Sequence, residues 1–116
     1  MKLKEVKEIL QAEVLTGEDE LYIEVLSACG CDMMSDVLAF VKDQSILITG
    51  LVNPQVVRTA LMMDMKCIVF VRGKKPDDKI VEMAAEHELV IMTSKFRMYE
   101  ACGMLYIRGL RPKEAA

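Results

Sequence analysis

Short apolar runs alternate with amphipathic segments along most of the chain. In the first of these segments, Leu3, Val6, Ile9 and Leu10 recur at helical spacing between charged residues, which is typical of a short amphipathic helix. Further along, apolar and polar positions alternate as in a strand and then return to helical spacing. The pattern predicts a helix over 2–11, strands over 13–15 and 22–27 with a turn over 16–19 between them, and a helix over 32–41.

From residue 45 onward, strands and helices alternate regularly. Cys67–Val71 is a continuous apolar run, typical of a strand that helices cover on both faces. Pro54 suits the first position of a helix, where its missing N–H costs nothing. The predicted strands are 45–49, 67–71 and 89–92; the predicted helices are 54–64, one opened by residues 76–78, and 95–105, with a frayed tail after Arg108.

Alternation of this kind predicts parallel βαβ units with right-handed crossovers. The expected fold class is α/β, a three-layer α/β/α sandwich with a mostly parallel sheet. We expect one domain over residues 1–116, with a smaller N-terminal lobe at 1–45 and a βαβαβα core at 45–107. A chain of 116 residues is long enough to bury a real core.

Composition narrows the function classes. Apolar residues make up 53% of the chain, aromatic residues only 5%, and ten methionines must fill much of the core. A net charge of −3 gives no electrostatic attraction for nucleic acid or an anionic membrane. No apolar run reaches the ~20 residues of a membrane span, and the N-terminus lacks the apolar core of a secretion signal. We therefore expect a cytoplasmic protein whose four cysteines are reduced thiols.

Most of the chain resembles a known family. The segments that carry the resemblance are TGLVNPQVVRTALMMDMKCIVFVRGKKPDDKIVEMA and VIMTSKFRMYEACGML, which resemble the DRTGG domain family. The opening LKEVKEILQAEVLTGEDE, together with VLSACGCDMMSDVLAF, is similar to the N-terminal domain of HPr kinase. The resemblance implies a standalone accessory domain with an HPr kinase N-terminal domain-like fold. Its implied roles are regulation and dimer contacts, not chemistry of its own.

The residues that name the family are replaced in this chain. Leu51-Val52 stands after Gly50 where the family has Asp-Arg, and Val71-Arg72-Gly73 stands where it has Thr-Gly-Gly. Only the last glycine of the motif is kept.

Several residues should meet at the carboxyl edge of the predicted sheet, where open α/β sheets bind ligands. A small anionic or nucleotide ligand is predicted there, with exposed N–H groups at two helix N-termini beside a guanidinium. The alternative is that Asn53 and Ser94 only cap helices and that the charged turn after Arg72 is solvated. A P-loop is excluded, because Ile68 stands where its first glycine belongs. The candidate ligand-binding residues are Gly50, Asn53, Arg72, Gly73, Thr93 and Ser94.

The sequence gives little support for catalysis or for metal binding. Cys29 and Cys31 place two thiols one residue apart, which does not complete a tetrahedral metal site, and structural thiols are the favoured interpretation. His87, the single histidine, falls at a predicted helix end with no serine or cysteine beside it in sequence. We predict no catalytic residues, no metal and no cofactor.

Excess apolar surface on the outer helices indicates a protein interface. Three methionines within residues 62–65 cannot all point inward, and the last helix is apolar nearly all round. Isolated exposed methionines are the alternative. Exposing such a helix would leave a large apolar patch in water, so a homodimer is predicted. Its candidate interface residues are Met62, Met63, Met98, Tyr99 and Cys102.

Three functions follow from these observations. The leading one is a non-catalytic homodimeric regulatory or ligand-sensing module with a small anionic or nucleotide ligand. The alternative is a pure interaction subunit that docks onto a metabolic enzyme or kinase. The third is an enzyme that uses groups of its substrate or partner, with His87 as the base.

Overall fold

The computed structural model describes residues 1–40 and 45–111. Its five strands form one sheet in the order β1-β5-β4-β3-β2. The elements in chain order are α1 (Leu3–Leu10), β1 (Glu13–Thr16), the 3-10 turn η1 (Glu18–Glu20), β2 (Ser27–Gly30), α2 (Met34–Phe40), β3 (Ser45–Thr49), α3 (Pro54–Met62), β4 (Cys67–Phe70), α4 (Asp78–Glu86), β5 (Val90–Thr93) and α5 (Met98–Ile107).

Strands β2 to β5 run parallel, and each lies beside the next in the sequence. Strand β1 pairs antiparallel with β5, so that Glu13 lies opposite Thr93. Residues 1–45, predicted as a smaller lobe, thus contribute both outer strands of the same sheet.

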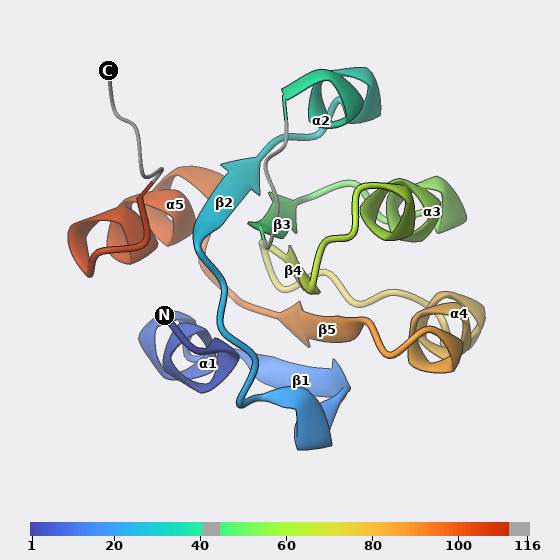
Figure 1. The fold of residues 1–116 in the computed structure, drawn as a ribbon, viewed down its shortest axis with the longest axis horizontal. Helices are drawn as coiled ribbons and strands as arrows, with labels where there is room; N and C mark the ends of the chain where they lie inside the picture. Colours follow the sequence, from blue (N-terminus) through green and yellow to red (C-terminus); the bar gives the residue numbers. More distant parts are fainter. Residues whose placement is uncertain (41–44, 112–116) are drawn as a thin grey trace.

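Helices cover the sheet on both faces (Figure 1). One apolar cluster packs α1 and α5 against side chains such as Ile46 and Val69. The other packs α2, α3 and α4 against the alternating set, such as Leu47 and Ile68. The predicted three-layer α/β/α fold with a mostly parallel sheet is confirmed. After β3 and β4 the chain continues into helices on one face of the sheet, α3 and α4. After β5 it continues into α5 on the other face.

Two helix starts follow directly from local sequence. The Asn53 side chain accepts the Val56 N–H at 3.1 Å, and Pro54 occupies the first turn of α3. The Asp77 side chain caps α4 through the Ile80 N–H at 3.0 Å. Capping by Asn53 is therefore confirmed.

The predicted strand over 22–27 is wrong. The strand β2 begins only at Ser27, and the preceding segment crosses the start of α1. There the carbonyls of Leu21 and Ile23 accept the N–H groups of Lys4 and Leu3. The alternating residues thus satisfy the free donors of a helix N-terminus instead of a strand partner.

Two helix starts also lie later than predicted. Helix α2 begins at Met34, not Asp32, and Val41 lies outside the described residues. Helix α5 begins at Met98 rather than Lys95, and its N-cap is Arg97. Ser94 therefore does not cap α5; its hydroxyl is used elsewhere. The end of the tail, residues 112–116, is also outside the described part of the chain.

Candidate functional site: a basic edge of the sheet

Five cationic side chains come from two adjacent loops at the carboxyl ends of the strands. The loops are joined by the Arg72 N–H bonded to the Phe96 carbonyl and the Gly73 N–H bonded to the Ser94 carbonyl, both at 2.8 Å. We call these five residues the basic edge: Arg72, Lys74 and Lys75 after β4, and Lys95 and Arg97 after β5.

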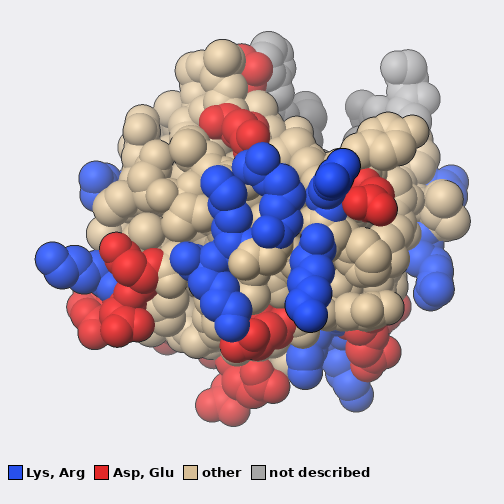
Figure 2. All heavy atoms as spheres, turned by 180° about the vertical axis from the view of Figure 1, so that it is seen from behind, with Lys and Arg blue, Asp and Glu red and all other residues tan. Residues whose placement is uncertain are grey.

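The loops after β3 and β4 recede behind the sheet in Figure 1. In the view from behind, Lys and Arg side chains gather in the middle of the face, with acidic side chains around them (Figure 2). The loops after β4 and β5 meet where α4 and α5 diverge to opposite faces of the sheet. Open α/β sheets place ligands at such divergences.

Arg72 and Gly50 are brought together as predicted. Arg72 adopts a left-handed backbone (φ 62°), which turns the chain sharply after β4. Its guanidinium lies so close to Gly50 that a Cβ added there would collide with it. Glycine at position 50 therefore makes room for the guanidinium.

Asp32 completes the arrangement, and the sequence interpretation missed it. Its Oδ1 accepts the Gly50 N–H at 2.8 Å and the Thr49 hydroxyl at 2.9 Å. The Gly50 N–H is the main cause of a lowered Asp32 pKa; the Thr49 hydroxyl and the charges of Arg72 and Lys74 add to it, against a smaller opposing effect of burial. The carboxylate thus stays ionised beside the basic edge. The available signal is an acidic residue shortly after a strand, but the predicted helix over 32–41 includes Asp32.

Of the other predicted residues, Thr93 and Ser94 have internal roles. The Thr93 hydroxyl donates to the Lys74 carbonyl at 2.6 Å and holds the two loops together. The Ser94 hydroxyl is buried and donates to the Leu10 carbonyl at 2.9 Å. Gly73 is exposed at the turn with a positive φ of 67°. Of the six predicted residues, Gly50 and Arg72 lie in contact, and Asn53, Thr93 and Ser94 direct their polar atoms into the fold.

Three backbone donors at this edge already have partners within the fold. The Gly50 N–H bonds Asp32, the Leu51 N–H bonds the Thr49 hydroxyl, and the Gly73 N–H bonds a carbonyl. An anion beside Arg72 would therefore be held by long side chains rather than by these three N–H groups. Lys75 is partly engaged, since its Nζ lies 3.1 Å from a Glu13 carboxylate oxygen.

Most of this chain matches a known domain family. A family model described as the DRTGG domain matches residues 5–106, which is most of the chain. The chain belongs to the DRTGG domain family. The resemblance seen in the sequence is thereby confirmed.

A solved structure has the same fold as this DRTGG domain. It is the crystal structure of the CBS and DRTGG domains of the regulatory region of Clostridium perfringens pyrophosphatase, complexed with its activator, diadenosine tetraphosphate. The two share 16% sequence identity and superpose with a TM-score of 0.75. The match covers 90% of this chain and 45% of that one, so the chain spans less than half of its neighbour. No curated protein matches the chain.

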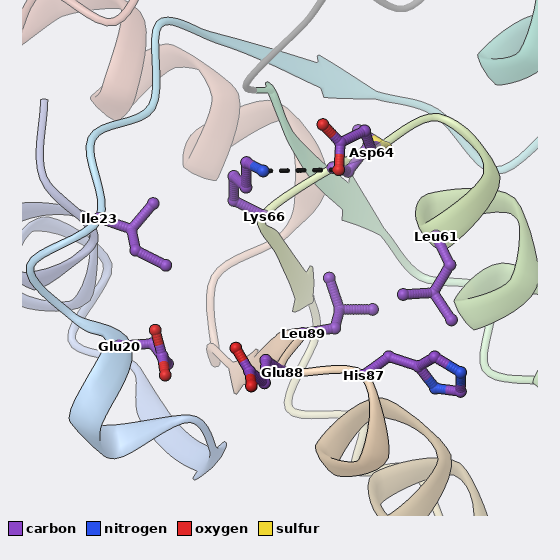
Figure 3. Close-up of a pocket in the computed structure, with 9 residues that line it drawn as sticks. Glu20, Ile23, Leu61, Asp64, Lys66, His87, Glu88 and Leu89 are labelled. Atoms are coloured by element: carbon purple, nitrogen blue, oxygen red, sulfur yellow. Dashed lines mark hydrogen bonds and ion pairs between the residues drawn. The ribbon is translucent and has the colours of Figure 1, made fainter.

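At the opposite end of the sheet, the DRTGG domain has a small hollow (Figure 3). It has a volume of about 180 Å³ and is lined by Glu20, Ile23, Leu61, Asp64, Met65, Lys66, His87, Glu88 and Leu89. Lys66 pairs with Asp64 at 3.5 Å, and the His87 Nδ1 lies 3.0 Å from the Met83 carbonyl of its own helix. None of the nine lining residues is a serine, threonine or cysteine that His87 could activate. Within the described residues, no group of three or more His, Cys, Asp or Glu side chains is placed to hold a metal ion.

The candidate interface residues of the DRTGG domain fall on two faces. Met62 is the last residue of α3 and Met63 is its C-cap, whereas Met98, Tyr99 and Cys102 belong to α5 across the sheet. Met62 is 72% exposed, Met63 half-buried and Met65 buried, which confirms that the three cannot all point inward. Helix α5 is apolar on nearly every side, and none of the helices within the described ranges is long and apolar enough to cross a bilayer.

The four cysteines are free thiols. Burial raises the pKa of Cys67, and it also raises those of Cys102 and Cys29, with a further contribution to Cys29 from the neighbouring Cys31 and Cys102. Raised pKa values keep these thiols protonated and poorly nucleophilic at neutral pH. The burial of these three thiols favours a structural role for them.

Proposed function

We propose that this DRTGG domain is a non-catalytic homodimeric regulatory module that binds a small anionic ligand of the nucleotide class at its basic edge. The observation that carries the proposal is the convergence of five cations from two adjacent loops in a chain whose net charge is −3. Phosphate oxygens accept hydrogen bonds readily from Arg and Lys side chains. The regulatory region with the similar fold is complexed with a nucleotide activator, which supports the same ligand class.

Ligand binding is tested by calorimetric titration and thermal shift with ATP, diadenosine tetraphosphate and acetyl phosphate. Because Arg72 offers charge-assisted hydrogen bonds, Arg72→Ala should weaken binding by about tenfold. The matched control is Arg58→Ala, which removes an exposed arginine from α3 and should leave affinity unchanged. If no compound binds, or if both variants bind equally well, the proposed ligand site is wrong.

A second candidate function is docking onto a metabolic enzyme or kinase without any ligand. It is favoured by the exposed apolar surface of α5 and by the presence of the similar fold within a larger pyrophosphatase chain. Affinity capture with the full chain distinguishes the two. A stable larger partner together with no nucleotide binding would support this candidate against the first.

A further inference from the structure

Four of the five cations in the basic edge have no ion-pair partner among the described residues. Lys75 has one, because its Nζ lies 3.1 Å from a Glu13 carboxylate oxygen. The four others are exposed and form no ion pair with any residue of 1–40 or 45–111: Arg72, Lys74, Lys95 and Arg97. Like charges repel one another, so gathering them without partners costs stability. Such a conflict is expected where a ligand of opposite charge binds.

Acidic residues surround these cations, but most of their carboxylates are bonded to the backbone. Asp32 accepts a backbone N–H at 2.8 Å, Asp77 accepts one at 3.0 Å and Glu100 accepts one at 3.2 Å. Asp78 is exposed and makes no ion pair within the described ranges. The acids therefore border the cations, as Figure 2 shows for this face, without forming close ion pairs with four of them.

The two loops of the basic edge offer few groups that could recognise a nucleotide base. Bases are recognised by stacking on aromatic rings and by hydrogen bonds to their edges. The aromatic residue of these loops, Phe96, is half-buried and packs against the apolar cluster of α1 and α5. Five N–H groups of the loops are bonded within the fold, those of Arg72, Gly73, Lys74, Phe96 and Arg97. Ammonium and guanidinium groups remain, and these bind phosphate oxygens.

The exposed aromatic ring closest to these loops along the chain is that of Tyr99, in the first turn of α5. It is 91% exposed and borders a shallow depression on the outer side of the helix. The other residues that line this depression all belong to α5, and none comes from the loops of the basic edge. Tyr99 is therefore the ring to test for contact with a base.

We propose that the basic edge binds the phosphate chain of its ligand and does not select the base. The ligand class is a linear chain of three or more phosphates, either free or attached to any nucleoside. This inference rests on the proposed function and specifies which part of the ligand is recognised. Each added phosphate brings further charged acceptors for the unpaired cations, so affinity should increase with the length of the chain.

Calorimetric titration of the full chain tests this, with AMP, ADP, ATP, GTP and inorganic tripolyphosphate in buffer without divalent cations. The dissociation constants of ATP, GTP and tripolyphosphate should agree within about fivefold, because the base adds little. ADP should bind more weakly than ATP. AMP should bind at least ~tenfold more weakly than ATP, since it lacks two of the three charged groups.

Three variants locate the contact. Lys95→Ala should weaken ATP and tripolyphosphate by the same factor, about fivefold, and Tyr99→Ala should weaken neither. The matched control is Lys4→Ala, which removes an exposed lysine near the start of α1 and should leave both affinities unchanged. Thermal midpoints of all variants check that they are folded.

The outcomes separate this inference from the proposed function. If ATP binds but tripolyphosphate or GTP binds far more weakly, the base is selected and this inference alone is wrong. A loss of ATP affinity in Tyr99→Ala, with tripolyphosphate affinity unchanged, would contradict it in the same way. If none of the five compounds binds, or if Lys4→Ala weakens binding as much as Lys95→Ala, the proposed ligand site is wrong as well.

Discussion

The Asp32 carboxylate connects the ends of two strands, because it follows β2 and accepts hydrogen bonds from Thr49, the last residue of β3, and from Gly50 after it. Asp32→Asn should lower the free energy of unfolding by about 1 kcal/mol at pH 7, less than the ~1.5–3 kcal/mol of buried hydrogen bonds to charged groups, because Asp32 is exposed. Its folded pKa lies below the unfolded value of about 3.9. The stabilisation is therefore present above pH ~4 and is lost as the pH falls through the folded pKa.

Urea denaturation of both proteins between pH 7 and pH 3 measures this effect. The difference between them should narrow as the pH falls below about 4. The exposed Asp19 of η1 offers a matched control, and Asp19→Asn should change stability by less than ~0.5 kcal/mol at either pH. A difference that does not depend on pH would contradict the role of the ionised carboxylate.

Gly50 sets the position of the Arg72 guanidinium, so Gly50→Ala should displace it. Because the obstructing atoms belong to the end of a flexible side chain, unfolding free energy should fall by less than ~1 kcal/mol. Affinity for the nucleotide should fall several-fold, as measured by calorimetry. Equal affinity in both proteins would mean that the guanidinium position does not matter for binding.

The sequence could place Gly50 and Arg72 at one sheet edge, because each follows a strand recognisable by its apolar run. It could not place Asp32 there, because the two donors to its carboxylate come from a different strand end. Nor could it show that the hydroxyls of Thr93 and Ser94 are directed inward. Those directions depend on the Lys74 and Leu10 carbonyls, which lie far along the chain.

Among the helices, α3 begins at a position that its local sequence determines. Asn53→Ala removes the side chain that accepts the Val56 N–H and should cost about 1 kcal/mol in urea denaturation. Nucleotide affinity should be unchanged, because the amide oxygen already has its partner. A loss of affinity without a loss of stability would instead assign Asn53 to the ligand.

Ser94 connects the loop between β5 and α5 to the end of α1. Its hydroxyl donates to the last carbonyl of α1 and accepts the Phe96 N–H in the loop between β5 and α5. Ser94→Ala leaves that buried carbonyl without this partner, so we expect a loss of ~1–3 kcal/mol in unfolding free energy. Ser35→Ala, at an exposed serine on α2, is the matched control and should be near neutral. Equal effects of the two would show that the hydroxyl bonds contribute little.

Strand β2 shows the limit of pattern-based prediction. Its sequence, Ser-Ala-Cys-Gly, consists of small residues with little preference for strands, whereas the preceding residues alternate as a strand should. Pairing with the buried β3 makes it a strand. The buried central strands, by contrast, were predicted from their apolar runs, because two covered faces leave no polar positions.

For the molecule as a whole, the reaction rate of the buried Cys67 thiol measures unfolding of the entire domain. It lies in the central strand β4 and is fully buried. With a disulfide reagent under native conditions, we expect Cys67 to react only through unfolding and much more slowly than the half-buried Cys31. Mass spectrometry of labelled peptides over time measures the two rates. Comparable rates would mean that β4 is exposed without unfolding.

The pairing of β1 with β5 has a consequence for protein synthesis. An edge strand that leaves the ribosome early has its hydrogen-bonding partner only after β5 has been translated. Until then its backbone groups are unpaired, and the growing chain carries an open strand available to chaperones or to aggregation. Pairing between segments so distant along the chain also slows folding, because a long loop must close first.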